Sequence, residues 1–476
     1  MLPERASSAY DRPRPRVSGV NGTSALPGAS PKIDSRLREA VDSVLAIESE
    51  TLLSQIPTAP SADADADAQN TMLRETLALA GQARYLVTFT GILKLESEAA
   101  YELLDTALAP LDTFALFRDK DGRQVVHLFS GRINPVPRKP WINLVLFIVT
   151  FISVLFVGTE IALNEIAGAG ASPQEIEALV NNFLGELWRG LPYAVSIMAI
   201  LGAHELGHYF AGRRHRLAVT LPYFIPMPFN GIGTFGAFIQ LRQPMRNRKV
   251  LLDVGLAGPL MGLLFAIPIV IVGLATSEIK VIQSGLVEGN SLIYALIKTI
   301  LFGEFLPNGV YDVYVNQLAW AGWTGLLITG LNLIPIGQLD GGHVLYALLG
   351  ERARQLYVPL MMAMGALVLL TVSTSPVWIV WLLLLLFFGR LYAVPLDNIT
   401  RLDPMRRRWA LLGLLLFVVT FVPLPLAPIE AATVPDGATA WALPLVVGLC
   451  TLWTRRRGLA IVLKRRATGT HRDSSD

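Results

Sequence analysis

The chain has 476 residues, of which 52% are hydrophobic and 16% are charged, and its formal net charge at pH 7 is +3. Soluble domains contain about one quarter charged residues, so this composition excludes a wholly soluble protein and indicates an integral membrane protein. The single cysteine, Cys450, excludes an internal disulfide and a zinc–thiolate cluster. We expect no nucleic-acid partner.

Residues 1–136 contain no apolar run of membrane-spanning length. Residues 1–71 combine a polar, proline-rich tail, a helix-like stretch from Asp34 to Ile56 and a low-complexity linker, and we expect no cleavable secretory signal. Residues 72–136 alternate between helix-like and strand-like segments, with a hairpin turn at 120–122, and predict a small cytoplasmic α/β domain. We interpret His127, in the last strand of this domain, as a structural histidine.

Eight apolar runs follow, and each is a candidate transmembrane helix. They cover residues 141–163, about 189–212, 250–275, 318–335, about 356–373, 376–394, 409–427 and about 439–453. Basic residues concentrate in alternate loops and acidic residues in the others, which places both termini in the cytoplasm by the positive-inside rule. We divide this part into a membrane core at 141–394, additional C-terminal helices at 395–454 and a basic cytoplasmic tail at 455–476.

The second apolar run contains the pattern H-E-x-x-H at His204, Glu205 and His208. In a helix the two histidines lie on one face and can hold one divalent metal ion, while Glu205 can reach a water molecule on that ion. Ionisable residues inside a membrane segment are costly and are therefore functional candidates. The alternative is a chance match on a core helix.

A catalytic zinc ion takes three protein ligands and a water molecule, so the pattern needs a third ligand. Asp340 is the best candidate, because it lies in an otherwise uncharged run of more than twenty residues. We expect it at the cytoplasmic end of the fourth span, at the same depth as His204 and His208. The proline and glycines around it break the helix and let the acid face the bundle interior. We interpret His343 as a structural residue or a support for a ligand.

Residues 217–241 are apolar but lack a helical period, and the turn at Asn230-Gly231 predicts a β-hairpin. Such a hairpin can enter the membrane and offer a strand edge to an unwound substrate, although a purely structural hairpin is the alternative. Candidate substrate-binding residues are Gly233, Thr234, Phe235 and Asn332. Asn332 has an alternative role as a cap of the broken helix. We therefore predict an all-α polytopic membrane protein of about eight transmembrane helices, with a membrane-associated β-hairpin region and a small N-terminal soluble α/β domain.

The H-E-x-x-H pattern, joined to Asn332-x-x-Pro335 and Leu339-Asp340-Gly341-Gly342, resembles the site-2 protease family of intramembrane zinc metalloproteases. The resemblance runs from the second to the fourth span, and the stretch GTFGAFI is similar to the cyanobacterial and chloroplast branch. It implies a protease core at 141–394 and one catalytic Zn²⁺ held by His204, His208 and Asp340. It further implies that Glu205 is the general base and acid in regulated cleavage of a transmembrane protein substrate within the lipid bilayer.

Two other functions stay open, a membrane metal-ion transporter and a non-catalytic scaffold or chaperone. The polar residues cluster at one depth, whereas a cation path needs them through several spans, so the protease is favoured. We expect a prokaryotic cytoplasmic membrane rather than a plastid membrane, because Glu4 and Asp11 are atypical of a transit peptide. The substrate, the scissile bond and the oligomeric state are not readable from the sequence.

Overall fold

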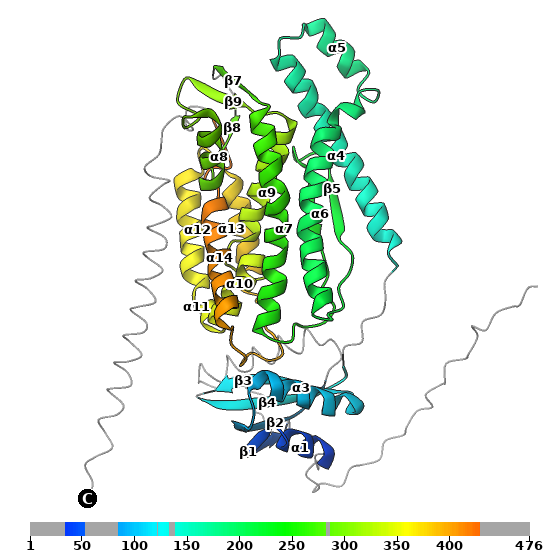
Figure 1. The fold of residues 1–476 in the computed structure, drawn as a ribbon, viewed down its shortest axis with the longest axis vertical. Helices are drawn as coiled ribbons and strands as arrows, with labels where there is room; N and C mark the ends of the chain where they lie inside the picture. The colour runs from blue at the N-terminus through cyan, green and yellow to red at the C-terminus, as the bar shows by residue number, and fades with distance from the viewer. Residues whose placement is uncertain (1–33, 53–83, 121, 133–138, 282–285, 429–476) are drawn as a thin grey trace, which may run out of the picture.

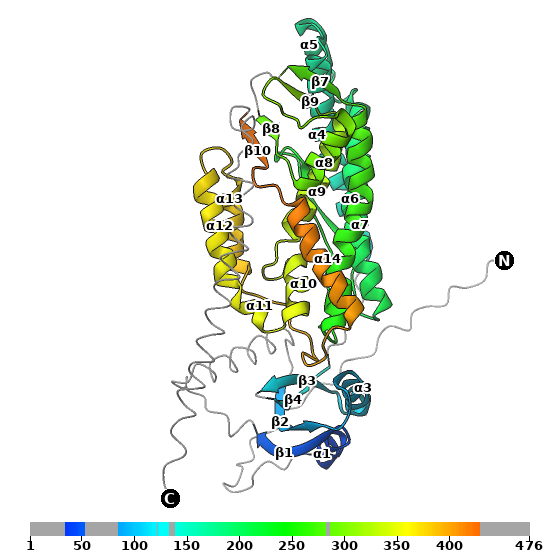
Figure 2. The same ribbon diagram turned by 60° about the vertical axis from the view of Figure 1, so that its left-hand side comes forward.

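A computed structural model describes residues 34–52, 84–120, 122–132, 139–281 and 286–428. The predicted proline-rich tail, the linker, the eighth apolar run and the basic C-terminal tail lie outside these residues. The described part of the chain forms a small α/β domain that lies against one end of a long helical bundle (Figure 1). A view from another side shows the same stacking of the two parts (Figure 2).

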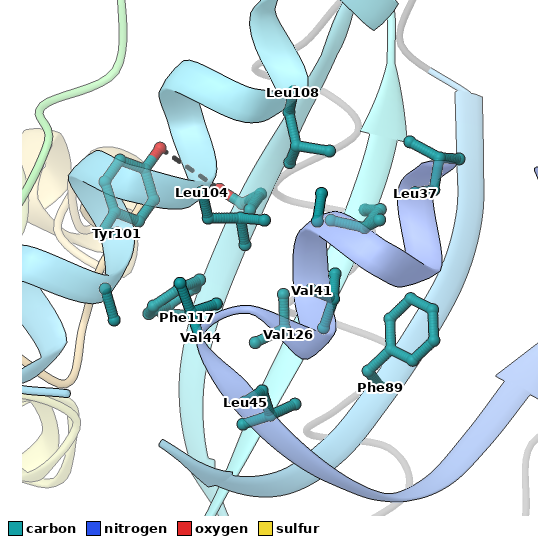
Figure 3. Packing of buried hydrophobic residues seen from close by; sticks show 14 of the residues in the cluster. Leu37, Val41, Val44, Leu45, Phe89, Tyr101, Leu104, Leu108, Phe117 and Val126 are labelled. Atoms are coloured by element: carbon teal, nitrogen blue, oxygen red, sulfur yellow. Dashed lines mark hydrogen bonds between the residues drawn. The ribbon is translucent and has the colours of Figure 1, made fainter. Parts of the chain in front are cut away.

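The small domain is a four-stranded antiparallel sheet in the order β1-β2-β4-β3, with helices packed on one face. Its elements are α1 (Ser35–Asp42), β1 (Leu45–Leu52), β2 (Arg84–Leu93), α3 (Ser97–Leu108), η2 (Ala109–Leu111), β3 (Thr113–Lys120) and β4 (Arg123–Ser130). Lys120 pairs directly with Arg123, so the predicted hairpin turn between β3 and β4 is confirmed. The core lies between the sheet and both helices, where Val41, Leu104 and Phe117 are completely buried (Figure 3).

The prediction of one helix from Asp34 to Ile56 is wrong over residues 43–52, while residues 53–56 lie outside the described part of the chain. The helix α1 buries Leu37, Ala40 and Val41, and the next residues pair with β2 as the strand β1. In this strand Leu45 is completely buried, and its backbone gains hydrogen-bond partners along the edge of the sheet. The sheet of the small domain therefore includes a strand that precedes residue 72, where we predicted the domain to begin.

The bundle contains eight principal helices among the described residues. They are α4 (Trp141–Gly168), α6 (Leu191–Arg214), α7 (Arg248–Ala275), α9 (Gln317–Asn332), α10 (Asp340–Leu349), α12 (Tyr357–Thr371), α13 (Val377–Phe388) and α14 (Pro404–Thr420). The other helices of this part are α5 (Pro173–Asn181), η3 (Leu187–Gly190), α8 (Leu292–Phe302) and α11 (Arg352–Gln355). The helices α6, α7 and α9 pack on one another, and α10 packs on α7.

Three helical segments of the described residues are long and apolar enough to cross a membrane, namely α4, α7 and the stretch Arg352–Thr371 that joins α11 and α12. The protein is therefore a mostly helical integral membrane protein with some sheet, and the count of eight spans stays a prediction. The helix α9 has only 16 residues, fewer than the roughly 20 that a span requires. Both α6 and α9 are largely enclosed by other helices, so they have less need of an apolar surface than a helix that faces lipid.

The predicted β-hairpin is confirmed as β5 (Tyr223–Met227) paired with β6 (Gly233–Phe238). It lies along α4, where the Ser153 hydroxyl donates to the Gly233 carbonyl over 2.7 Å. Two further pairs, β7 (Glu278–Val281) with β9 (Tyr311–Tyr314) and β8 (Leu286–Glu288) with β10 (Leu426–Pro428), lie at the end of the bundle away from the small domain (Figure 2).

His127 gives the small domain a predicted sensitivity to acid. Burial lowers the pKa of His127 to about 3, and its Nδ1 atom lies 2.7 Å from the Thr88 hydroxyl. An unfolded histidine has a pKa of about 6.5, so the unfolded chain binds the proton first and stability falls as the pH drops from about 6.5 towards 3. We expect the hydrogen-exchange protection of β4 to decrease from pH 7 to pH 4.5, and to decrease less in His127→Gln. An equal decrease in both proteins would contradict this role.

Candidate metal centre

Three ligand atoms from α6 and α10 converge inside the bundle. The Oδ2 atom of Asp340 lies 3.2 Å from His204 Nε2 and 3.3 Å from His208 Nε2. The two Nε2 atoms are 3.2 Å apart, so the three atoms form a nearly equilateral triangle. All three side chains are largely shielded from solvent. Among the described residues, this is the one group of three histidine, cysteine or acidic side chains whose possible ligand atoms all lie within 4.8 Å of one another.

The triangle has the dimensions of a tetrahedral metal site. Ligand atoms at 2.0–2.1 Å from a tetrahedral ion are about 3.3 Å from one another, which matches the three observed edges. The Nδ1 atom of His208 lies 2.8 Å from the Val254 carbonyl and must donate to it, because a carbonyl only accepts. This bond leaves the lone pair on Nε2, the atom that points at Asp340. The donor set therefore fits one divalent cation with nitrogen and oxygen ligands.

The helix α7 makes room for the two histidines through glycines at the same spacing. A Cβ atom at Gly258 would lie 2.1 Å from His208 Nε2, and one at Gly262 would lie 3.1 Å from His204 Nδ1. Small residues such as these permit the close approach of two helices. The missed signal was the four-residue interval between the glycines, which equals the interval between His204 and His208.

Asp340 reaches the site through the helix break that the surrounding proline and glycines predicted, although the preceding helix ends earlier than expected. The predicted fourth span ended at residue 335, but α9 ends at Asn332 and Asp340 begins a separate helix, α10. The chain between them folds back so closely that a Cβ atom at Gly341 would lie 1.9 Å from the Leu333 carbonyl oxygen. The glycine after Asp340 thus permits the close approach that turns the carboxylate towards α6.

A cavity of about 850 Å³ opens onto the triangle. Its lining includes Glu205, which is 6% exposed and stands beside the triangle rather than in it. Asn332 and His343 also line the cavity, and the Asn332 amide nitrogen lies 3.5 Å from His204 Nε2. The site therefore places a carboxylate and an amide next to the three possible ligands.

The structure does not place Gly233, Thr234 and Phe235 in this cavity. The Thr234 hydroxyl is buried and donates to the Ile225 carbonyl over 2.7 Å, so it is used within the hairpin, while Phe235 is 65% exposed. The lining instead takes in residues 237–245, which include the end of β6 and the chain that follows it, and residues 392–394 after α13. Residues 237–241 belong to the stretch 217–241 that we predicted as a substrate edge, whereas residues 242–245 and 392–394 were missed.

Residues 192–372 match the family model described as Peptidase family M50. The chain is similar to the probable zinc metalloprotease EGY1, chloroplastic, of Arabidopsis thaliana, with 29% identity over 61% of this chain and 55% of that protein. It is 33% identical to the probable zinc metalloprotease EGY2, chloroplastic, of the same plant over 50% of this chain and 42% of that protein. The probable EGY1 protein of Oryza sativa subsp. japonica is 29% identical over 71% of this chain and 62% of its own length.

The chain thus spans about half the length of these curated relatives. No solved structure matches it. The matched segment contains the H-E-x-x-H pattern and Asp340, and the resemblance to the site-2 protease family is confirmed over this segment.

Replacing Gly258 tests whether the triangle binds a metal ion. In Gly258→Ala the new methyl group must displace the His208 imidazole, so we expect metal affinity to fall by about 10–100-fold, as for other changes that misorient a ligand. Elemental analysis of the purified protein measures the bound metal. Gly365→Ala is the matched control, because a Cβ atom there meets nothing within 4 Å. Equal metal content in the two variants would contradict the assignment.

Proposed function

Because residues 192–372 carry a Peptidase family M50 domain, we propose that this protein is a zinc metalloprotease of the membrane. Its substrates are membrane proteins, and it hydrolyses peptide bonds within or near their transmembrane helices. The observation that carries the proposal is the triangle of His204, His208 and Asp340 with Glu205 beside it, inside a bundle that contains apolar helices of membrane-spanning length.

The residues have separate tasks in this proposal. His204, His208 and Asp340 hold the zinc ion, which when bound supplies Lewis-acid polarisation of water and of the substrate carbonyl. Glu205 takes the proton from the attacking water and returns it to the leaving amine, and such general acid–base catalysis contributes about 10²–10⁴-fold. The Asn332 amide lines the same cavity and is a candidate donor to the substrate backbone.

The extended segment at 237–245 suits a substrate that enters without helical hydrogen bonds. It lines the cavity continuously, and Leu241 forms a β-bridge with Val219. A substrate helix must unwind before its peptide bonds are accessible, and an extended protein backbone can then pair with it. This assignment moves the predicted substrate contact from residues 233–235 to residues 237–245, which follow them along the chain.

The motif lies in the C-terminal half of α6, and the C-terminal end of this helix faces the small domain (Figure 1). Arg213 and Arg214 follow the motif at that end, which is the cytoplasmic end under the positive-inside rule. The relatives' names assign those proteins to chloroplasts, so the prokaryotic cytoplasmic membrane stays a prediction for this chain.

The variant Glu205→Gln tests the proposal. The amide cannot take a proton from water, so we expect cleavage of a single-span reporter protein in vesicles to fall by about 10²–10⁴-fold while metal content is retained. Glu160→Gln on the exposed surface of α4 is the matched control and should cleave like the wild type.

Other outcomes identify the alternatives. A transporter would move metal ions across the vesicle membrane equally well with glutamine at position 205. A scaffold would leave the reporter uncut in every form. Either result, or full cleavage by Glu205→Gln, would overturn the proposed function.

A further inference from the structure

The sheet of the small domain continues into the bundle through Asp397. This residue is completely buried and forms parallel β-bridges on both sides, with Phe117 of β3 and with Asn247 just before α7. Phe117 N donates to the Leu396 carbonyl over 2.9 Å, and Asp397 N donates to the Arg246 carbonyl over 2.8 Å. Paired backbone therefore joins the two parts of the described chain.

The Asp397 carboxylate fixes this junction with its own hydrogen bonds. It accepts from the Ser97 hydroxyl at the start of α3 over 2.9 Å, and both residues are buried. It also accepts from the backbone N–H groups of Ile399 and Thr400 over 2.9 and 3.1 Å. One side chain thus ties the small domain to the turn that follows the junction.

Arg118 of β3 makes a second connection. Its guanidinium is buried and donates to the carbonyl oxygens of Pro395 and Leu396 over 3.1 and 2.9 Å. Burying a guanidinium costs free energy unless its N–H groups are hydrogen-bonded. The hydrogen bonds to these two carbonyls therefore fix both the arginine side chain and the backbone at residues 395–396. Val394, the residue before Pro395, lines the cavity above the metal centre.

A charged contact supports the junction from outside. Glu98 of α3 pairs with Lys249 over 2.5 Å, and Glu102 pairs with Arg246 over 3.1 Å. The Asn247 amide also donates to Glu98 over 3.0 Å. The acidic face of α3 therefore lies on the basic start of α7.

Both backbone segments of the cavity wall end at this junction. The segment 237–245 runs directly into Arg246 and Asn247, and the segment 392–394 lies three residues before Asp397. A shift of the junction therefore displaces both segments, whereas His204, His208 and Asp340 are held separately by α6, α7 and α10.

We propose that the small α/β domain positions the two wall segments of the substrate cleft, with Asp397 and Arg118 as positioning residues. The domain thereby sets how tightly an extended substrate segment binds, without touching the reacting atoms. This inference rests on the proposed protease function for its kinetic consequence, and on the geometry alone for its structural consequence.

The first test uses Arg118→Met in the full-length protein, with Arg123→Met in the same sheet as the matched control. Arg123 pairs only with Glu48 of the small domain among the contacts described. We expect hydrogen exchange of residues 237–245 and 392–398 to accelerate about tenfold in Arg118→Met and to stay unchanged in the control. Carrying both variants in a Glu205→Gln background makes this readout independent of proteolysis.

The kinetic readout separates positioning from a loss of folded enzyme. We expect KM for the reporter to rise about tenfold in Arg118→Met at nearly constant kcat, because a displaced wall weakens binding in the ground state and the transition state alike. A fall in kcat at constant KM, or unchanged exchange of both wall segments, would overturn the inference. If the wild type cleaves nothing, the proposed function fails, and the exchange measurement still decides the structural claim.

A charge exchange guards against misfolding of the Arg118 variant. Glu98→Lys places like charges opposite Lys249 and should raise KM and wall exchange, and adding Lys249→Glu should restore both. Rescue by the second change supports the inference, since a misfolded domain would not recover. Identical values for the single and double variants would contradict it.

Discussion

The structure depends on bringing two imidazoles and one carboxylate to within 3.2–3.3 Å of one another in a largely apolar bundle. Burying each of these groups alone is unfavourable, and their lone pairs repel unless a cation or proton lies between them. The surrounding residues provide the space and the hydrogen bonds that these three side chains need. The glycines of α7 leave space for the rings, the Val254 carbonyl orients His208, and the turn before α10 delivers Asp340.

The part of the site that could be predicted from the sequence is the part that depends on the spacing of neighbouring residues. A four-residue interval places His204 and His208 on one face of any helix, and an isolated acid in apolar sequence marks Asp340 as a buried functional group. The start of α10 at Asp340 was harder to predict. The glycine that follows Asp340 is needed because the chain there passes close to Leu333, and no local sequence pattern shows this contact. The hydropathy pattern likewise predicted spans such as α9 whose surfaces largely face protein instead of lipid.

The features that we did not predict from the sequence depend on contacts between segments that are far apart along the chain. The strand β1 looked like the continuation of a helix, because its partner β2 begins more than thirty residues later. Asp397 pairs with Phe117 and Asn247, and nothing in its neighbourhood announces either partner. The hairpin turn was found correctly, yet its residues 233–235, which we expected to meet substrate, lie outside the cavity, whose lining takes in this part of the chain only from Ala237.

The distribution of the three ligands over α6 and α10 has a thermodynamic consequence. An ion held between these helices fastens them to each other and, through the hydrogen bond of His208 to Val254, to α7 as well. Binding to the folded state alone stabilises it by about 4 kcal/mol when free ion exceeds its dissociation constant a thousandfold. A bound ion would therefore stabilise the packing of α6, α7 and α10 against one another, and this part of the stability would depend on the concentration of free metal ion.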